Sequence, residues 1–252
     1  MKNKGLLLIG ALMTATVSAD TTLVYNDGKG VESSVMHLSD GIMKVTSNEG
    51  GQKSEVIYQA GAGSFTVVMH DEKKYMTFGP TEIEQLSDIS AMVDKMLDKQ
   101  LANMPESQRA QARAMMEGML KKQMPKQAPV PEYNKTSESR TVNGYSCDVV
   151  EKLSKGKSTD DFCVADYEDL GVSSEEYAAI KAMMKVAEKM ASQFGVDTSM
   201  NFEQVGEVLP VQYEMNGVKA NLVEVKHNDL GKQMFQVPSD YEKQSIPELG
   251  MN

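Results

Sequence analysis

The side chains most able to do chemistry in this 252-residue sequence are those that contain sulfur, 20 methionines and 2 cysteines. The sequence also has 3 histidines and no tryptophan. Cys147 and Cys163 flank Ser154-Lys155-Gly156, a segment that can form a three-residue β-hairpin loop with its glycine in the left-handed conformation. Pairing Leu153 with Lys157 places the two cysteines directly opposite each other, within disulfide distance. We therefore predict a Cys147–Cys163 disulfide, with two buried free thiols as the alternative.

The methionines allow three interpretations. Thioethers are soft ligands for Cu(I), so methionine and histidine could hold this ion. Two methionine groups could face one another across two helices: Met115, Met116 and Met119 in one, and Met183, Met184 and Met190 in the other. Unbranched thioether side chains also repack around irregular apolar guests, as at promiscuous binding surfaces. The third interpretation is ordinary core packing, because these residues lie on helical stripes that must be buried in any case.

The sequence has no recognisable catalytic constellation. His37, His70 and His227 are far apart along the chain, and none has the spacing of a zinc ligand. The segment that begins at Asp197 resembles the start of a calcium loop, but Phe202 stands where that loop needs glycine. We therefore expect a protein that is not an enzyme and has no cofactor.

Residues 1–19 have the features of a secretory signal peptide. These features are Lys2 and Lys4, an apolar run from Leu6 to Leu12, and the small residues Val17-Ser18-Ala19. The apolar run is far shorter than the ~20 residues of a membrane span, and no cysteine follows it to carry a lipid anchor. We expect a periplasmic protein that begins at Asp20 and has no stable membrane insertion.

The charge of the mature chain argues against nucleic acid as a partner. Removing Lys2 and Lys4 from the 26 basic side chains leaves 24 against 36 acidic ones, a net charge of −12. Such a chain repels nucleic acid and anionic membranes. Residues 20–252 are long enough to bury a core as a single domain.

Strand patterns occupy both ends of this region. Residues 21–78 contain six short apolar or alternating runs separated by turn residues, which predicts an antiparallel meander. Alternation over Leu209–Met215, followed by Asn216-Gly217, predicts a hairpin whose second strand is Lys219–His227. A last short strand is expected at Lys232–Val237.

Helical periodicity occupies the middle. An insertion at 81–124 begins with a Thr81–Glu84 capping box and one apolar stripe, and a second helix starts near Pro105. Another helix, capped by Ser173 and Glu176, runs to Gly195. The order sheet, helices, sheet predicts an α+β fold, a curved antiparallel sheet covered by helices with a methionine-rich insertion.

Several short blocks resemble those of an uncharacterised family of secreted bacterial proteins that is similar to the periplasmic lipoprotein carriers LolA and LolB. The blocks are Gly41–Val45, Val67–Tyr75, Val142-Asn143-Gly144-Tyr145 before Cys147, and Met234–Pro238 before Tyr241. The resemblance implies a half-open antiparallel barrel with helices over its concave face. It also implies an apolar cavity that, in the carriers, receives acyl chains.

These observations lead to one expected site, an apolar groove between the sheet and the helical stripes. Its expected ligand is a lipid, a lipoprotein acyl chain or an apolar peptide. The residues expected to line it are Ile83, Leu86, Met92, Met96, Met115, Met119, Met183, Met190 and Phe194. The alternatives are a Cu(I)-binding protein that uses methionine and histidine, and a structural protein-interaction module.

Overall fold

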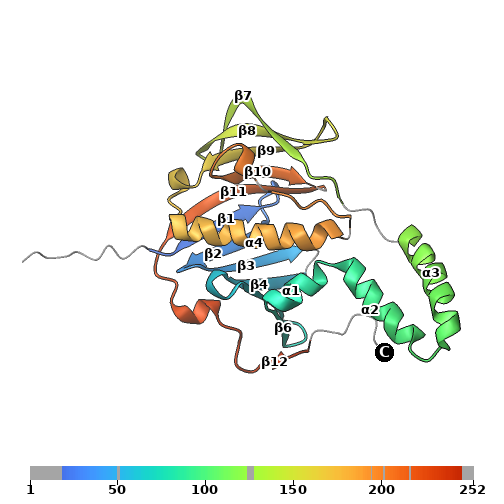
Figure 1. The fold of residues 1–252 in the computed structure, drawn as a ribbon. Coiled ribbons are helices and arrows are strands. Elements are labelled where there is room, and N and C mark those ends of the chain that lie inside the picture. Colours follow the sequence, from blue (N-terminus) through green and yellow to red (C-terminus); the bar gives the residue numbers. More distant parts are fainter. Residues whose placement is uncertain are drawn as a thin grey trace, which may run out of the picture.

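The computed structural model describes residues 19–49, 52–123, 128–193, 195–200, 202–215 and 217–245. In this part of the chain the fold is α+β, with a large curved sheet of twelve strands that does not close and with four α-helices (Figure 1). Residues 1–18 of the expected signal peptide lie outside the described residues, as do Met124 and Phe194.

The sheet has two antiparallel halves, one formed by strands β2 to β6 and the other by strands β7 to β11, and they lie on either side of strand β1. The strands are β1 (Thr21–Asn26), β2 (Glu32–Ser39), β3 (Ile42–Glu49), β4 (Gln52–Gln59), β5 (Ser64–Met69), β6 (Lys74–Phe78), β7 (Glu132–Val142), β8 (Tyr145–Ser154), β9 (Lys157–Asp166), β10 (Val208–Met215), β11 (Val218–His227) and β12 (Glu242–Lys243). Their order is β12-β6-β5-β4-β3-β2-β1-β11-β10-β9-β8-β7, and β12 alone runs parallel to its neighbour. The predicted meander and the predicted β10–β11 hairpin are confirmed.

The helices are α1 (Pro80–Leu86), α2 (Ile89–Leu101), α3 (Glu106–Gln123) and α4 (Ser174–Gln193). The first expected helix is broken in two, because the Asp88 carboxylate accepts the Ala91 N–H at 2.8 Å and starts α2 there. The expected Thr81–Glu84 capping box is also wrong: Glu82 instead accepts the Gly79 N–H at 3.0 Å.

The capping box of α4 is confirmed. The Ser173 N–H donates to the Glu176 carboxylate at 2.8 Å, and the Glu176 N–H donates to Ser173 Oγ at 3.3 Å. Figure 1 shows α4 lying along one face of the sheet, where it contacts β3 and β4, whereas α3 lies to the side of the strands.

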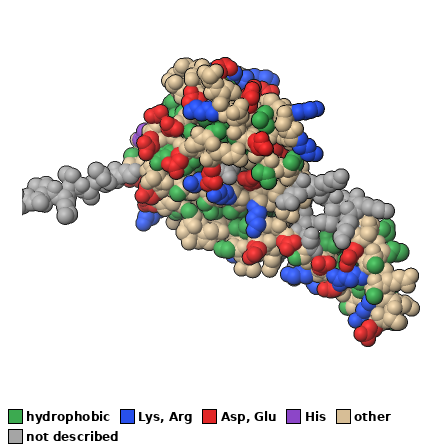
Figure 2. Space-filling model, turned by 45° about the horizontal axis from the view of Figure 1, so that its top comes forward, with side chains coloured by type: hydrophobic (Ala, Val, Ile, Leu, Met, Phe, Trp, Pro, Cys, Tyr) green, Lys and Arg blue, Asp and Glu red, His purple; other side chains and the backbone are tan. Residues whose placement is uncertain are grey.

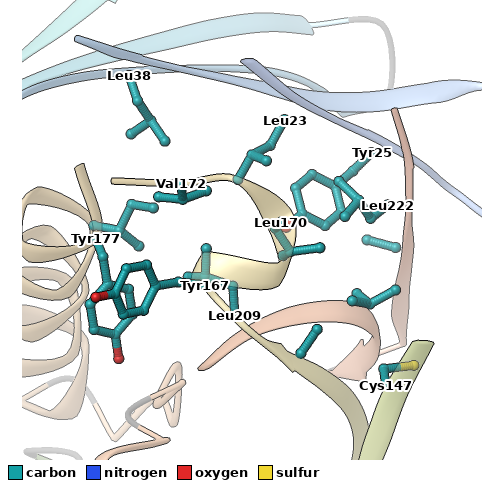
Figure 3. Close-up of a cluster of buried hydrophobic side chains, with 14 of the residues drawn as sticks. Leu23, Tyr25, Leu38, Cys147, Tyr167, Leu170, Val172, Tyr177, Leu209 and Leu222 are labelled. Atoms are coloured by element: carbon teal, nitrogen blue, oxygen red, sulfur yellow. The ribbon is translucent and has the colours of Figure 1, made fainter. Parts of the chain in front are cut away.

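The main core lies between α4 and one face of the sheet, called the inner face below. Leu23, Leu38 and Met43 on this face are at most 2% exposed, and they belong to the same cluster as Tyr177 and Ile180 of α4. Figure 3 shows how side chains from both halves of the sheet, from the η2 turn (Glu168–Leu170) and from α4 meet in this cluster. Burial of these groups fixes the position of the N-terminal half of α4 on the sheet.

The predicted disulfide is confirmed. Cys147 and Cys163 are bonded, their Cα atoms are 5.3 Å apart, and both belong to the inner-face core. The expected register is wrong, because the residue opposite Cys163 is Val149. The disulfide therefore joins diagonal neighbours on one face of the hairpin.

The register differs because the hairpin loop is shorter than expected. Ser154 pairs with Lys157, which leaves a loop of Lys155 and Gly156, both with positive φ (52° and 74°). A two-residue loop of this kind matches the twist of the flanking strands. Together with a register shift after Lys152, it slides the strands by two positions. A slip of two keeps every side chain on its face, so the cysteines still meet.

Two further expectations are corrected at the margins of the sheet. Strand β7 was missing from the expected elements because it is an edge strand with mostly exposed, polar residues and no apolar alternation. The strand expected at Lys232–Val237 is instead the 3-10 turn η4 (Lys232–Phe235), with Phe235 buried. Lys44 of β3 holds this turn by donating to the Met234 carbonyl at 3.0 Å.

Candidate functional site

An apolar groove lies between α4 and strands β4 and β5. Its volume is about 380 Å³, and it is lined by Val56, Phe65, Met183, Val186, Ala187, Met190 and Ala191. None of these seven described residues has a polar side chain. Figure 2 shows hydrophobic side chains gathered across the middle of the sheet-bearing part of the molecule, with charged side chains on both sides.

Val56, on the floor of the groove, belongs to an apolar row that crosses five strands. Adjacent members of this row are paired directly across the antiparallel ladder, so all of them point to the inner face. The row consists of Met36, Val45, Val56, Val67 and Met76, and all five residues are half-buried. A row of apolar side chains that the protein itself covers only in part offers a surface for another apolar molecule.

The wall of the groove is the C-terminal half of α4. Met183, Ala187 and Met190 recur at the three- and four-residue spacing that places side chains on one side of a helix. Residues 181–193 are half-buried or exposed, whereas Tyr177, Ala179 and Ile180 in the preceding turns are buried. The first turns of α4 are therefore packed tightly on the sheet, whereas its C-terminal half is only partly packed against it.

Buried polar contacts hold the start of α4. The Glu176 side chain is almost fully buried, and it accepts the backbone N–H and the hydroxyl of Thr21, each at 3.0 Å. Tyr177 stacks on Tyr167 with 4.5 Å between the ring centroids, and burial raises the pKa of both phenols. These contacts tie the wall of the groove to β1 and to the segment that precedes the helix.

Helix α1 borders the same region from the other side. It follows Phe78, whose ring stacks on the groove residue Phe65 with centroids 4.7 Å apart. The helix contacts both β6 and α4, with Ile83 buried and Leu86 half-buried. The expected lining residues Ile83 and Leu86 lie on α1 and are not among the residues that line the groove.

Of the residues expected to line the site, Met183 and Met190 are in the groove. Met96 is half-buried on α2, and the side chain of Met92 on that helix is not among those described. Met115 and Met119 on α3 are 66% and 57% exposed, so the expectation that they face the sheet is wrong.

Five groove residues were missing from the expected set: Val56, Phe65, Val186, Ala187 and Ala191. The strand Phe65–Met69 did contain a signal, because apolar residues on both of its sides predict a sheet covered on both faces. The valines and the alanines are too common in cores to be assigned to a site from sequence.

The histidines are engaged elsewhere. On the outer face of the sheet, His70 Nδ1 lies 2.8 Å from the Tyr241 hydroxyl, and its Nε2 lies 3.3 Å from the buried Glu55 carboxylate, which also pairs with Lys44 at 2.9 Å. Burial, reinforced by Lys44, lowers the pKa of His37 on the same face. Within the described ranges, no three His, Cys, Asp or Glu side chains are grouped so that they could hold a metal ion.

None of the helices in the described part of the chain is both long enough and apolar enough to span a membrane. All seven described residues that line the groove have apolar side chains. These seven side chains offer hydrocarbon and thioether groups, and none of them is a strong nucleophile or a general base.

Comparisons with known proteins add a family but no activity. A family model described as "Domain of unknown function (DUF4412)" matches residues 107–241, more than half of the chain. This range includes α4 but not the groove residues Val56 and Phe65. No curated protein matches the sequence. Among solved structures, an uncharacterized conserved protein from Thermus thermophilus is 6% identical, with a TM-score of 0.43 over 90% of this chain and 91% of that chain.

Proposed function

The chain belongs to the DUF4412 family, and from this premise we propose that it is a non-enzymatic binding protein that holds the hydrocarbon part of a lipid in the groove beneath α4. The observation that carries the proposal is the lining itself, seven apolar residues around about 380 Å³. Pockets for small ligands have volumes of roughly 300–1,000 Å³ and are mostly apolar.

The energetics favour an acyl chain over a polar ligand. Apolar surface removed from water contributes about 25 cal/mol per Å², which needs no specific polar partner in the protein. A polar ligand would instead lose its hydrogen bonds to water, since none of the seven described lining side chains can replace them. The unbranched side chains of Met183 and Met190 can adjust to chains of different shape.

We also propose that the protein acts in the periplasm and has the architecture of the LolA and LolB carriers. The signal-like residues 1–19 and the Cys147–Cys163 disulfide support the first part, because disulfides persist in oxidising compartments. A curved sheet that does not close, with α4 across its inner face, supports the second. In this proposal the groove is the counterpart of the acyl-chain cavity.

The test uses the chain from Asp20 onward, purified from the periplasm. Native mass spectrometry after gentle purification should detect bound lipid, and a fluorescent fatty acid should bind and be displaced by unlabelled fatty acid. Copper mass without lipid would favour the Cu(I) alternative instead. Absence of bound lipid together with absence of probe binding would contradict the proposal.

A matched pair of variants locates the site. Ala187→Glu places a charge in the groove at an exposed helical position, so folding should be preserved. We expect it to weaken probe binding by about tenfold or more, because a carboxylate beside hydrocarbon loses hydration. Ala114→Glu makes the same change at an exposed position of α3 and should leave binding unchanged. Equal losses in the two variants would place the probe outside the groove.

A further inference from the structure

Two of the seven groove residues, Met183 and Met190, have side chains that can be oxidised under mild conditions. Both are half-buried and both line a groove that opens to the surface, so a small oxidant can reach their sulfur atoms. The remaining lining residues are valine, phenylalanine and alanine, which are inert to peroxides. Among the seven described lining residues, peroxide chemistry is therefore confined to these two thioethers.

We propose that Met183 and Met190 form an oxidation site that controls ligand binding, an inference that rests on the proposed function of the groove. The oxidant is a peroxide. A sulfur lone pair attacks one peroxide oxygen, the O–O bond breaks, and a sulfoxide S–O bond forms. The thioether loses two electrons, and with hydrogen peroxide the other oxygen leaves as water.

A sulfoxide changes the groove because none of the seven described lining side chains can bind the new oxygen. A sulfoxide oxygen is a strong hydrogen-bond acceptor, and no side chain among the seven lining residues is a donor. The backbone N–H groups of α4 are used within the helix. A bound acyl chain would therefore cover an unpaired polar group, so oxidation lowers affinity for the chain by about tenfold or more.

The chain contains its own controls. Met115 and Met119 on α3 are exposed, so their oxidation leaves the sulfoxides in water and does not change the groove. Met43 is 2% exposed in the inner-face core and should stay reduced until the protein unfolds. Oxidation at these three positions can be measured in the same sample as that of the groove methionines.

The experiment treats the full mature chain with hydrogen peroxide, maps sulfoxides by peptide mass spectrometry and then measures binding of the fluorescent fatty acid. We expect sulfoxide at the two groove methionines and a loss of affinity of about tenfold. The variant M183L/M190L replaces both thioethers by inert apolar side chains. Its affinity for the probe after treatment should equal that of the same variant before treatment. The variant M115L/M119L should lose affinity as the wild type does.

The outcomes separate this inference from the function on which it rests. Untreated protein that binds no probe contradicts the proposed function. If untreated protein binds the probe, unchanged binding by protein with mapped sulfoxide at both groove positions overturns the oxidation site. It is also overturned if Met183 and Met190 stay reduced while Met115 and Met119 are fully oxidised, or if M183L/M190L loses affinity on treatment.

Discussion

Helices α4 and α3 each contain three methionines at helical spacing, yet they occupy different surroundings. Helix α4 lies on the sheet, with Ile180 1% exposed in the core and Met183 in the groove. Helix α3 lies beside the sheet and exposes Met115 and Met119 to solvent (Figure 1). An apolar stripe therefore indicates one apolar side of a helix but does not determine which surface covers it.

The two helices are also held by different forces. Tyr177 and Glu176 of α4 are buried against Tyr167 and Thr21. Helix α3 is tied to α2 by Arg113, which pairs with Asp94 and Asp98 of α2 and with Glu117 of its own helix. Burial contributes stability that salt hardly changes, whereas exposed ion pairs are screened.

The largest expected difference between the helices is in core packing. Ile180→Ala should lower the free energy of unfolding by about 2–5 kcal/mol, because it removes buried methyl groups and leaves a cavity. Met119→Ala in α3 should change it by no more than about 0.5 kcal/mol, as at other exposed positions. Urea unfolding followed by circular dichroism measures both. Similar losses in the two variants would mean that α3 is packed as firmly as α4.

A smaller effect is expected from the carboxylate at the start of each helix. Glu176→Gln removes a buried charge that accepts three hydrogen bonds and should cost about 1–3 kcal/mol. Glu106→Gln changes the same group in the first turn of α3, where it is exposed, and should cost about 0.3–1 kcal/mol. Urea unfolding of the pair decides whether the Thr21 contact anchors α4, and a Glu176 variant as stable as its control would show that it does not.

The two helices should also differ in how their stability responds to alkaline pH. Burial raises the pKa of Tyr177 above its usual value of about 10, so the folded state favours the neutral phenol. The stability from this group is present below about pH 10 and is lost as pH rises through the raised pKa. Tyr177→Phe should therefore move alkaline unfolding, followed by circular dichroism, to higher pH. Helix α3 contains no tyrosine. Alkaline loss of helical structure in α3 alone would therefore contradict the assignment of this unfolding to Tyr177.

The sequence predicts the parts of the site that depend on local periodicity. The meander, the α4 capping box and the disulfide partners follow from turn residues and spacing, and Met183 and Met190 were expected in the groove. The disulfide was predicted despite a wrong register, because a slip of two residues keeps Cys147 and Cys163 on one face.

The rest depends on how elements pack, which periodicity does not specify. Val56 and Phe65 line the groove only because α4 lies over this part of the sheet, next to β4 and β5. Met115 and Met119 are exposed because α3 packs on α2 through charged side chains. Strand β7 lies at the edge of the sheet with mostly exposed, polar residues, so its sequence has no apolar alternation from which a strand could be predicted.

The smallest expected effect is the response of α3 to salt. At about 1 M salt the Debye length is roughly 3 Å, so the exposed contacts of Arg113 with Asp94 and Asp98 should weaken. Amide hydrogen exchange in α3 should then become faster, while exchange in the buried first turns of α4 should not change, because apolar burial is not screened. Arg113→Gln in low salt should reproduce the same local effect without a change in the urea midpoint. Salt-independent exchange in α3 would instead indicate that apolar contacts with α2 hold the two helices together.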